Sequence, residues 1–106
     1  MHDTYVLAVD IGGTKLETAV VDESGRIVGG TRSRRPTGRD RKRDDVIGDL
    51  RDSIAESLAG APVPVTAAGI GSAGPIDAVF GAVAPLNLPR LHGLPVREIV
   101  EAAAGV

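Results

Sequence analysis

Residues 5–22 have the sequence Tyr5-Val-Leu-Ala-Val-Asp10-Ile-Gly-Gly-Thr-Lys15-Leu-Glu-Thr-Ala-Val-Val-Asp22. The apolar run at 6–9 does not alternate with polar residues, which is typical of a central strand covered on both faces. Two glycines follow Asp10 and allow a tight turn that a ligand can approach closely. Thr18, Val20 and Val21 then favour a second strand. The pattern predicts a β-hairpin whose tip carries a carboxylate, bare backbone, a hydroxyl and an ammonium group.

These groups suit a metal-bound polyphosphate, but their spacing excludes two common phosphate loops. A P-loop needs Gly-x-x-x-x-Gly-Lys-Ser/Thr before a helix, and a dinucleotide site needs Gly-x-Gly-x-x-Gly before a helix. Neither is present, and residues 16–21 are typical of a strand. Phosphate would therefore be held by turn amides rather than by a helix dipole. The residues alone leave an alternative open, an ordinary Gly-Gly hairpin with solvated Asp10 and Lys15.

Composition indicates one small globular domain or part of one. The chain has 106 residues, of which 42% are hydrophobic and 25% charged, as in ordinary globular proteins. It has no cysteine, which excludes disulfides and cysteine-bound metals. No apolar stretch approaches membrane-spanning length, and the net charge of −2 gives no general attraction to nucleic acid. We therefore expect neither nucleic acid nor a membrane as a partner, and a cytoplasmic location.

The rest of the chain predicts two further strands and two helices. A third strand is expected at 26–34, and the basic segment at 35–43 is interpreted as a solvated connector. A strand of small residues is expected at 65–71. A crossover through a helix at 44–58 would place that strand beside the first one. A short helix at about 95–104 completes the pattern.

The segment at 44–58 is the clearest helix. Asp44 or Asp45 is expected to cap its N-terminus, and Gly60 to end it. Its apolar side chains recur on one stripe: Val46, Ile47, Leu50, Ile54 and Leu58. The polar residues, Ser57 among them, are expected at the surface.

Three motifs, taken together, resemble one family. Asp10-Ile-Gly-Gly-Thr-Lys15 resembles the first phosphate motif of the sugar kinase/Hsp70/actin superfamily, and specifically of its ROK branch (repressors, open reading frames and kinases). Gly69-Ile-Gly-Ser-Ala-Gly-Pro-Ile-Asp77 resembles that branch's second signature, and Leu86-Asn-Leu-Pro89 resembles the segment that follows. The motifs fall in the family's order and cover nearly all of the chain. The sequence is therefore similar to the N-terminal part of a ROK-type sugar kinase.

This resemblance implies an α/β fold, the ribonuclease-H-like N-terminal lobe of an actin-like ATPase. Its mixed sheet would have the strand order 3-2-1-4, with strand 5 missing and helices at about 44–58 and 95–104. Residues 1–106 would form the N-terminal part of the first lobe of a ROK-type kinase, with the second lobe absent. Ligand groups would gather where the carboxyl ends of strands 1 and 4 diverge.

The resemblance also implies phosphorylation of a hexose or N-acetylhexosamine from ATP with Mg²⁺. Asp10 would hold Mg²⁺ through water. The phosphates would contact the cofactor-binding residues Gly12, Gly13, Thr14 and Lys15. For Lys15, the alternative is an ordinary surface lysine at a hairpin tip.

The sugar would contact Gly74, Pro75 and Asn87, although Asn87 also suits a turn. Asp77 would cap a turn rather than act as the base. The general base would be an aspartate beyond Val106, so no catalytic residue is expected within this chain, which alone would be inactive. The alternatives are a sugar-responsive ROK regulator without its DNA-binding domain and a non-catalytic interaction module. An unpaired fourth strand predicts a homo-oligomer.

Overall fold

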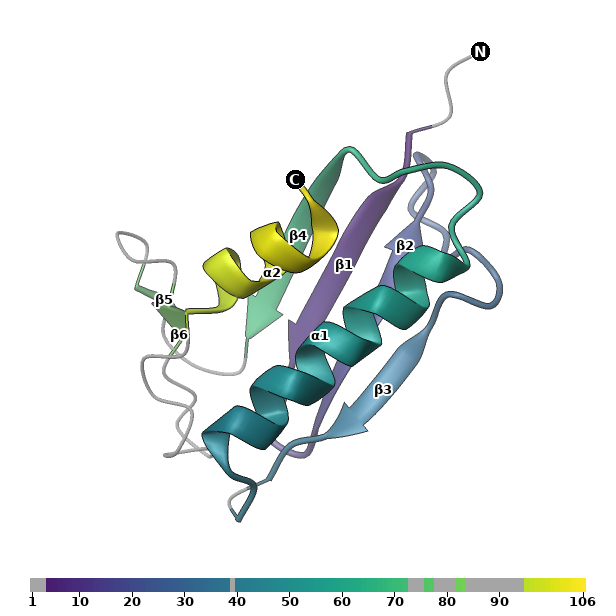
Figure 1. Cartoon of the computed structure of the whole chain (residues 1–106). Coiled ribbons are helices and arrows are strands. Elements are labelled where there is room, and N and C mark those ends of the chain that lie inside the picture. Colours follow the sequence, from purple (N-terminus) through teal and green to yellow (C-terminus); the bar gives the residue numbers. More distant parts are fainter. Residues whose placement is uncertain (1–3, 39, 73–75, 78–81, 84–94) are drawn as a thin grey trace.

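The computed structural model describes residues 4–38, 40–72, 76–77, 82–83 and 95–106. Its elements, in chain order, are β1 (Val6–Ile11), β2 (Lys15–Val21), β3 (Ser33–Pro36), α1 (Arg43–Ala59), β4 (Ala67–Ser72), β5 (Ile76–Asp77), β6 (Ala82–Val83) and α2 (Val96–Ala104). Figure 1 shows the two helices lying across one sheet. Strands β5 and β6 form a separate antiparallel pair.

The main sheet has the order β3-β2-β1-β4, which confirms the predicted topology. Strands β1 and β2 form an antiparallel hairpin in which Ile11 pairs with Leu16, and β3 pairs antiparallel with β2. Strand β4 lies parallel to β1, with Gly71 next to Asp10. Because β1 and β4 are parallel, their carboxyl ends meet at one edge of the sheet, and the β1–β2 hairpin tip lies at this same edge.

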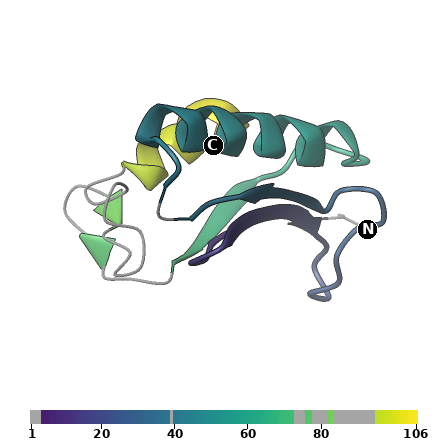
Figure 2. The same cartoon turned by 90° about the horizontal axis from the view of Figure 1, so that it is seen from below.

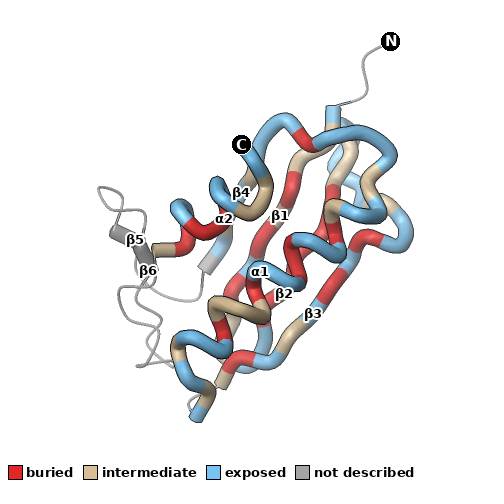
Figure 3. Tube along the Cα trace, viewed as in Figure 1, coloured by how far each residue is buried: buried red, intermediate tan, exposed pale blue. Residues whose placement is uncertain are grey.

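Both helices cover the same face of the sheet (Figures 1 and 2). The apolar side chains between the two layers form one core: Leu7, Val9, Ile11, Leu16, Val20, Val46, Leu50, Ile54, Val65, Val96, Ile99 and Val100. Figure 3 shows buried residues along both helices and along the strands that they cover. Each fully buried Leu, Ile or Val side chain contributes about 1.5–3 kcal/mol, so this one layer of contacts holds the helices against the sheet.

The opposite face of the sheet is open within the described part of the chain. Along β1, half-buried Val6 and Ala8 and exposed Asp10 alternate with buried Leu7 and Val9. The prediction that β1 is covered on both faces is therefore wrong for these residues. The apolar residues on the open face line a hollow of about 370 Å³, which also includes Asp10.

The third strand begins later than predicted. We expected it at 26–34, but β3 is Ser33–Pro36, preceded only by a single bridge between Val21 and Ile27. Gly30 has a φ of 82°, a left-handed conformation that interrupts an extended strand. Pro36, which the sequence placed in a loop, is the last residue of the strand.

Both predicted helices are confirmed, with changes at their ends. Lys42 rather than an aspartate is the N-cap of α1 and makes no capping side-chain bond, while Asp44 and Asp45 lie in the first turn, where the helix dipole favours negative charge. Ser57, expected at the surface, is fully buried. No helix in the described part of the chain is both long and apolar enough to cross a membrane.

Candidate phosphate-binding site

The tip of the β1–β2 hairpin is a tight turn that leaves little room for a side chain at residue 12. The Gly12 amide donates a hydrogen bond to the Lys15 carbonyl at 2.8 Å, which closes the turn. A Cβ at residue 12 would lie 3.1 Å from this same carbonyl oxygen, so a larger residue would crowd the bond that closes the turn. Thr14 and Lys15 are exposed, and Gly12 and Gly13 are half-buried. The turn therefore brings backbone, a hydroxyl and a lysine together at the edge of the sheet.

Asp10 lies beside this turn, with its carboxylate accessible to solvent. A Cβ at Gly71 of β4 would lie 3.6 Å from Asp10 Oδ1, so the glycine keeps that side of the carboxylate open. Among the described residues, no group of three or more His, Cys, Asp or Glu side chains gathers to hold a metal. A single accessible carboxylate fits a Mg²⁺ ion that keeps most of its water shell, which is how this ion usually binds. The residues present therefore fit water-mediated binding at Asp10.

The Lys15 ammonium contacts Glu17, two residues further along β2, at 3.2 Å. Arg34 and Arg32 contact the same carboxylate at 2.8 and 3.2 Å. Desolvation raises the pKa of Glu17, but hydrogen bonds from Lys15 and Arg32 and the arginine charges outweigh it, so the pKa lies below its usual value. Three cations around one anion leave net positive charge beside the hairpin tip.

The basic segment that begins near β3 is not the solvated connector that we predicted. Arg35 pairs with Glu56 of α1, and Arg41 pairs with Asp49 of the same helix. Ser33 donates a hydrogen bond to Glu56 at 2.8 Å. The hydrogen bonds from Arg35 and Ser33 hold the pKa of Glu56 below its usual value despite partial desolvation. These contacts attach the edge strand and its continuation to the helix layer.

Thr37 is a residue of this region that the sequence interpretation missed. It is only 5% exposed, and its hydroxyl contacts the hairpin tip instead of solvent. An uncharged, β-branched residue within an arginine-rich segment was the one available signal, since β-branched residues favour extended and packed positions.

The expected sugar contacts Gly74, Pro75 and Asn87 lie outside the described residues and stay predictions. His2 and His92 also lie outside them. Asp77 belongs to β5, where it pairs with Ala82 of β6.

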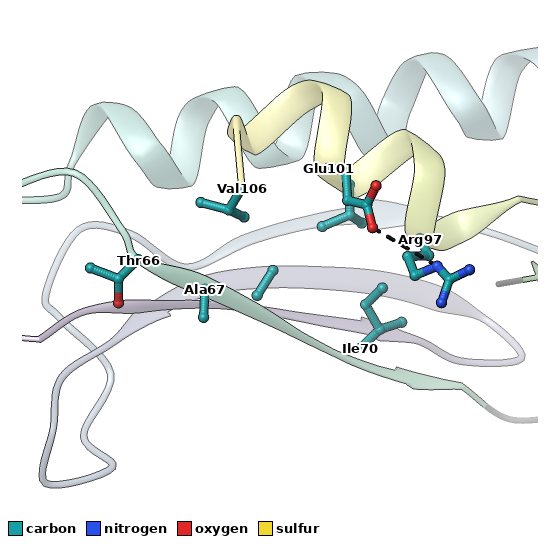
Figure 4. A pocket seen from close by; sticks show the side chains of 8 residues that line it. Thr66, Ala67, Ile70, Arg97, Glu101 and Val106 are labelled. Carbon is teal, nitrogen blue, oxygen red and sulfur yellow. Dashed lines mark ion pairs between the residues drawn. The ribbon is translucent and has the colours of Figure 1, made fainter. Parts of the chain in front are cut away.

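A groove of about 400 Å³ lies between β4 and α2, away from the hairpin tip (Figure 4). Ala67 and Ile70 of β4 and Val106 lie along it, and Arg97 and Glu101 stand at its rim, 3.9 Å apart. No residue of the tip lines this groove. The groove follows the edge of β4, which pairs with no further strand in the described part of the chain.

The sheet order and the two helices on one face define the class of fold: they match the N-terminal lobe of actin-like ATPases. Residues 6–106 match the model of the ROK family, and the chain belongs to that family.

Relatives of known structure or function carry the same segment. Glucokinase from Thermotoga maritima is 33% identical over 100 residues, which cover 92% of this chain and 30% of the glucokinase. ROK hexokinase from Thermus thermophilus is 29% identical, with a TM-score of 0.77 over 96% of this chain and 33% of the hexokinase. A ROK family glucokinase from Streptomyces griseus, in complex with glucose and AMPPNP, is 30% identical, with a TM-score of 0.76 over 96% of this chain and 31% of that one. This chain therefore spans about a third of the length of these relatives.

The same fold also occurs in a regulator. A ROK family transcriptional regulator, a homologue of the E. coli MLC protein, is 20% identical, with a TM-score of 0.72 over 96% of this chain and 26% of the regulator. Membership of the family therefore includes both sugar kinases and a transcriptional regulator.

Proposed function

We propose that residues 1–106 form the N-terminal, phosphate-binding part of the first lobe of an ATP-dependent sugar kinase. The observation that carries this proposal is the placement of Asp10 beside the hairpin tip, where the carboxyl ends of β1 and β4 meet. Two relatives named as glucokinases support it, one of them in complex with glucose and AMPPNP. The acceptor would be a hexose or an N-acetylhexosamine.

Each residue of the site has a role that its geometry suits. Bound Mg²⁺ would neutralise part of the negative charge on the phosphates. Asp10 would orient the water shell of this ion. Gly12 and Gly13 let the backbone approach the phosphates, and Thr14 offers a hydroxyl donor. Lys15 would add a point charge that it shares with Glu17.

The sugar side would be formed by Gly74, Pro75 and Asn87, because an amide can donate to one hydroxyl and accept from another. A general base must reach the sugar hydroxyl within hydrogen-bond distance. We assign this general base to an aspartate outside residues 1–106. The second lobe is likewise expected outside these residues. The 106-residue chain alone would then give no sugar-dependent ATP turnover, and the complete enzyme would act in the cytoplasm.

A sugar-responsive regulator is the second candidate, because a regulator of this family shares the fold. The two candidates differ in what the hairpin tip must do. A kinase must bind Mg²⁺·ATP at the tip, whereas a regulator needs only the sugar. Calorimetric titration of the full-length gene product with Mg²⁺·ATP and with a panel of sugars separates them.

The Gly13→Val variant makes this titration specific to the tip. A branched side chain at residue 13 would stand between the phosphates and the turn amides, so we expect Mg²⁺·ATP binding to weaken far more than sugar binding. Gly48→Ala is the matched control, because a Cβ at Gly48 of α1 meets no atom within 4 Å. If Gly13→Val leaves both affinities at the wild-type values, the tip is an ordinary turn and the kinase proposal loses its site.

A further inference from the structure

Thr37 makes two hydrogen bonds to the hairpin tip. Its amide donates to the Thr14 carbonyl at 2.9 Å. Its hydroxyl donates to the Gly12 carbonyl at 3.0 Å. Both bonds join residues more than twenty positions apart in the sequence, and the threonine that makes them is buried. The tip is therefore held from outside its own hairpin.

The residues on either side of Thr37 explain how it reaches the tip. Pro36 pairs with Lys15 at the end of β3, so residue 37 continues the β2–β3 ladder to the level of Thr14. Gly38 then has a φ of 108°, a conformation that only glycine adopts without strain, and the chain turns away. Thr37 thus lies where the edge strand ends, directly against the turn.

The bonds from Thr37 fix two peptide groups of the tip, the one that joins Gly12 to Gly13 and the one that joins Thr14 to Lys15. The Gly12 and Thr14 carbonyls both accept from Thr37, and the Lys15 carbonyl accepts from the Gly12 amide. The amides of Gly13 and Thr14, in contrast, have no acceptor among the residues that the structure describes. Successive free amides at a turn form a concave site for an anion. A rotated peptide would instead present a carbonyl oxygen, which repels phosphate.

We propose that Thr37 is a positioning residue that keeps the Gly12 carbonyl turned inward, and with it the Gly13 amide of the same peptide group turned outward and available for the polyphosphate group of a nucleotide. This inference rests on the proposed function for its ligand, but the hold on the tip can be measured without any ligand. Thr37 touches no reacting atom in this assignment. Its effect on phosphate binding passes through the conformation of the turn.

Two variants separate the hydroxyl from the shape of the side chain. Thr37→Val replaces the hydroxyl by a methyl group and leaves the Gly12 carbonyl without its partner, whereas Thr37→Ser keeps the donor. In the full-length gene product we would measure hydrogen exchange of the peptides that cover residues 11–16 and 35–38. We would also measure the affinities for Mg²⁺·ATP and for the sugar that the wild type binds.

We expect faster exchange at the tip in Thr37→Val and Mg²⁺·ATP binding weakened by about three- to tenfold, the effect of one hydrogen bond of ordinary strength. Sugar affinity should stay unchanged, and Thr37→Ser should behave like the wild type. The inference is overturned if Thr37→Val exchanges and binds ATP like the wild type, if serine weakens binding as much as valine does, or if both affinities fall together. A wild type that binds no Mg²⁺·ATP overturns the proposed function, and the exchange comparison then decides alone whether Thr37 holds the tip.

Discussion

Glu17 lies directly opposite Asp10 in the β1–β2 register, so two carboxylates occupy one row of the sheet. They are in different electrostatic environments. Glu17 is surrounded by Lys15, Arg32 and Arg34, whereas no ion pair joins Asp10 to another described residue. The negative charge of Glu17 is therefore neutralised by its neighbours, and that of Asp10 stays available for a hydrated cation.

The lowered pKa of Glu17 has a consequence for stability that depends on pH. The pKa of Glu17 in the folded protein lies below its pKa in the unfolded chain. Its contribution to the free energy of unfolding is therefore fully present above the unfolded-state pKa, and it is lost as the pH falls through the folded-state pKa. We expect Glu17→Gln to lower the melting temperature most near neutral pH, and the difference from the wild type to disappear in acid. Exposed ion pairs each contribute little to stability, so this difference in melting temperature should be small.

The control is Glu23→Gln, an exposed residue in the turn after β2. Melting curves of both variants and the wild type between neutral pH and strong acid provide the comparison. A gap for Glu17→Gln that stays constant or widens toward acid would contradict the assigned ion pairs.

At the scale of elements, helix α1 is fixed on β2 by buried hydroxyl groups as well as by apolar contacts. Thr18 Oγ1 donates to the Ser53 carbonyl at 2.9 Å and lies 2.8 and 2.6 Å from the hydroxyl oxygens of Ser53 and Ser57. Both serines are fully buried. Buried polar groups cost free energy when they are left unpaired, so this network favours the observed register of the helix on the strand.

Replacing the central hydroxyl tests this network. Thr18→Val keeps the shape of the side chain but leaves two serine hydroxyls without their shared partner, so we expect the free energy of unfolding to fall by about 1–3 kcal/mol. Serine hydroxyls can also donate hydrogen bonds to carbonyls of their own helix. The expected loss in the free energy of unfolding therefore lies toward the lower end of this range. Urea unfolding measures it, with Thr18→Ser as the control that keeps the hydroxyl. An unchanged midpoint in Thr18→Val would show that apolar packing alone positions α1.

Local patterns predicted some elements well and others poorly. The helix at Arg43–Ala59 follows from its apolar period, and the hairpin from the two glycines after Asp10. The start of β3 did not follow from its own residues, because Ser33 and Arg35 are held by a distant helix residue, Glu56. The same holds for Thr37, whose hydroxyl partner lies 25 positions earlier in the chain. Contacts between residues far apart in sequence leave no periodic signal.

At the scale of the whole molecule, the described residues place all helical cover on one face of the sheet (Figure 2). The other face carries Asp10, and the edge of β4 carries small residues beside the apolar groove. An unpaired strand edge of this kind is a site for pairing with another chain. Assembly into a homo-oligomer therefore stays a prediction. The arrangement also leaves the carboxyl ends of β1 and β4 accessible, which is what a phosphate site at this edge requires.

The most direct test of the kinase proposal is the turnover number of Asp10→Asn in the full-length gene product, measured by sugar-dependent ADP release with saturating Mg²⁺·ATP. Asparagine keeps the shape but removes the charge that would hold the hydrated ion. Loss of one electrostatic stabiliser costs on the order of a hundredfold or more in turnover. Asp52→Asn, an exposed residue on α1, is the control and should keep wild-type turnover. We expect Asp10→Asn to melt like the wild type while its turnover falls about a hundredfold. Wild-type turnover in Asp10→Asn would remove Asp10 from the mechanism and contradict the site that we have assigned.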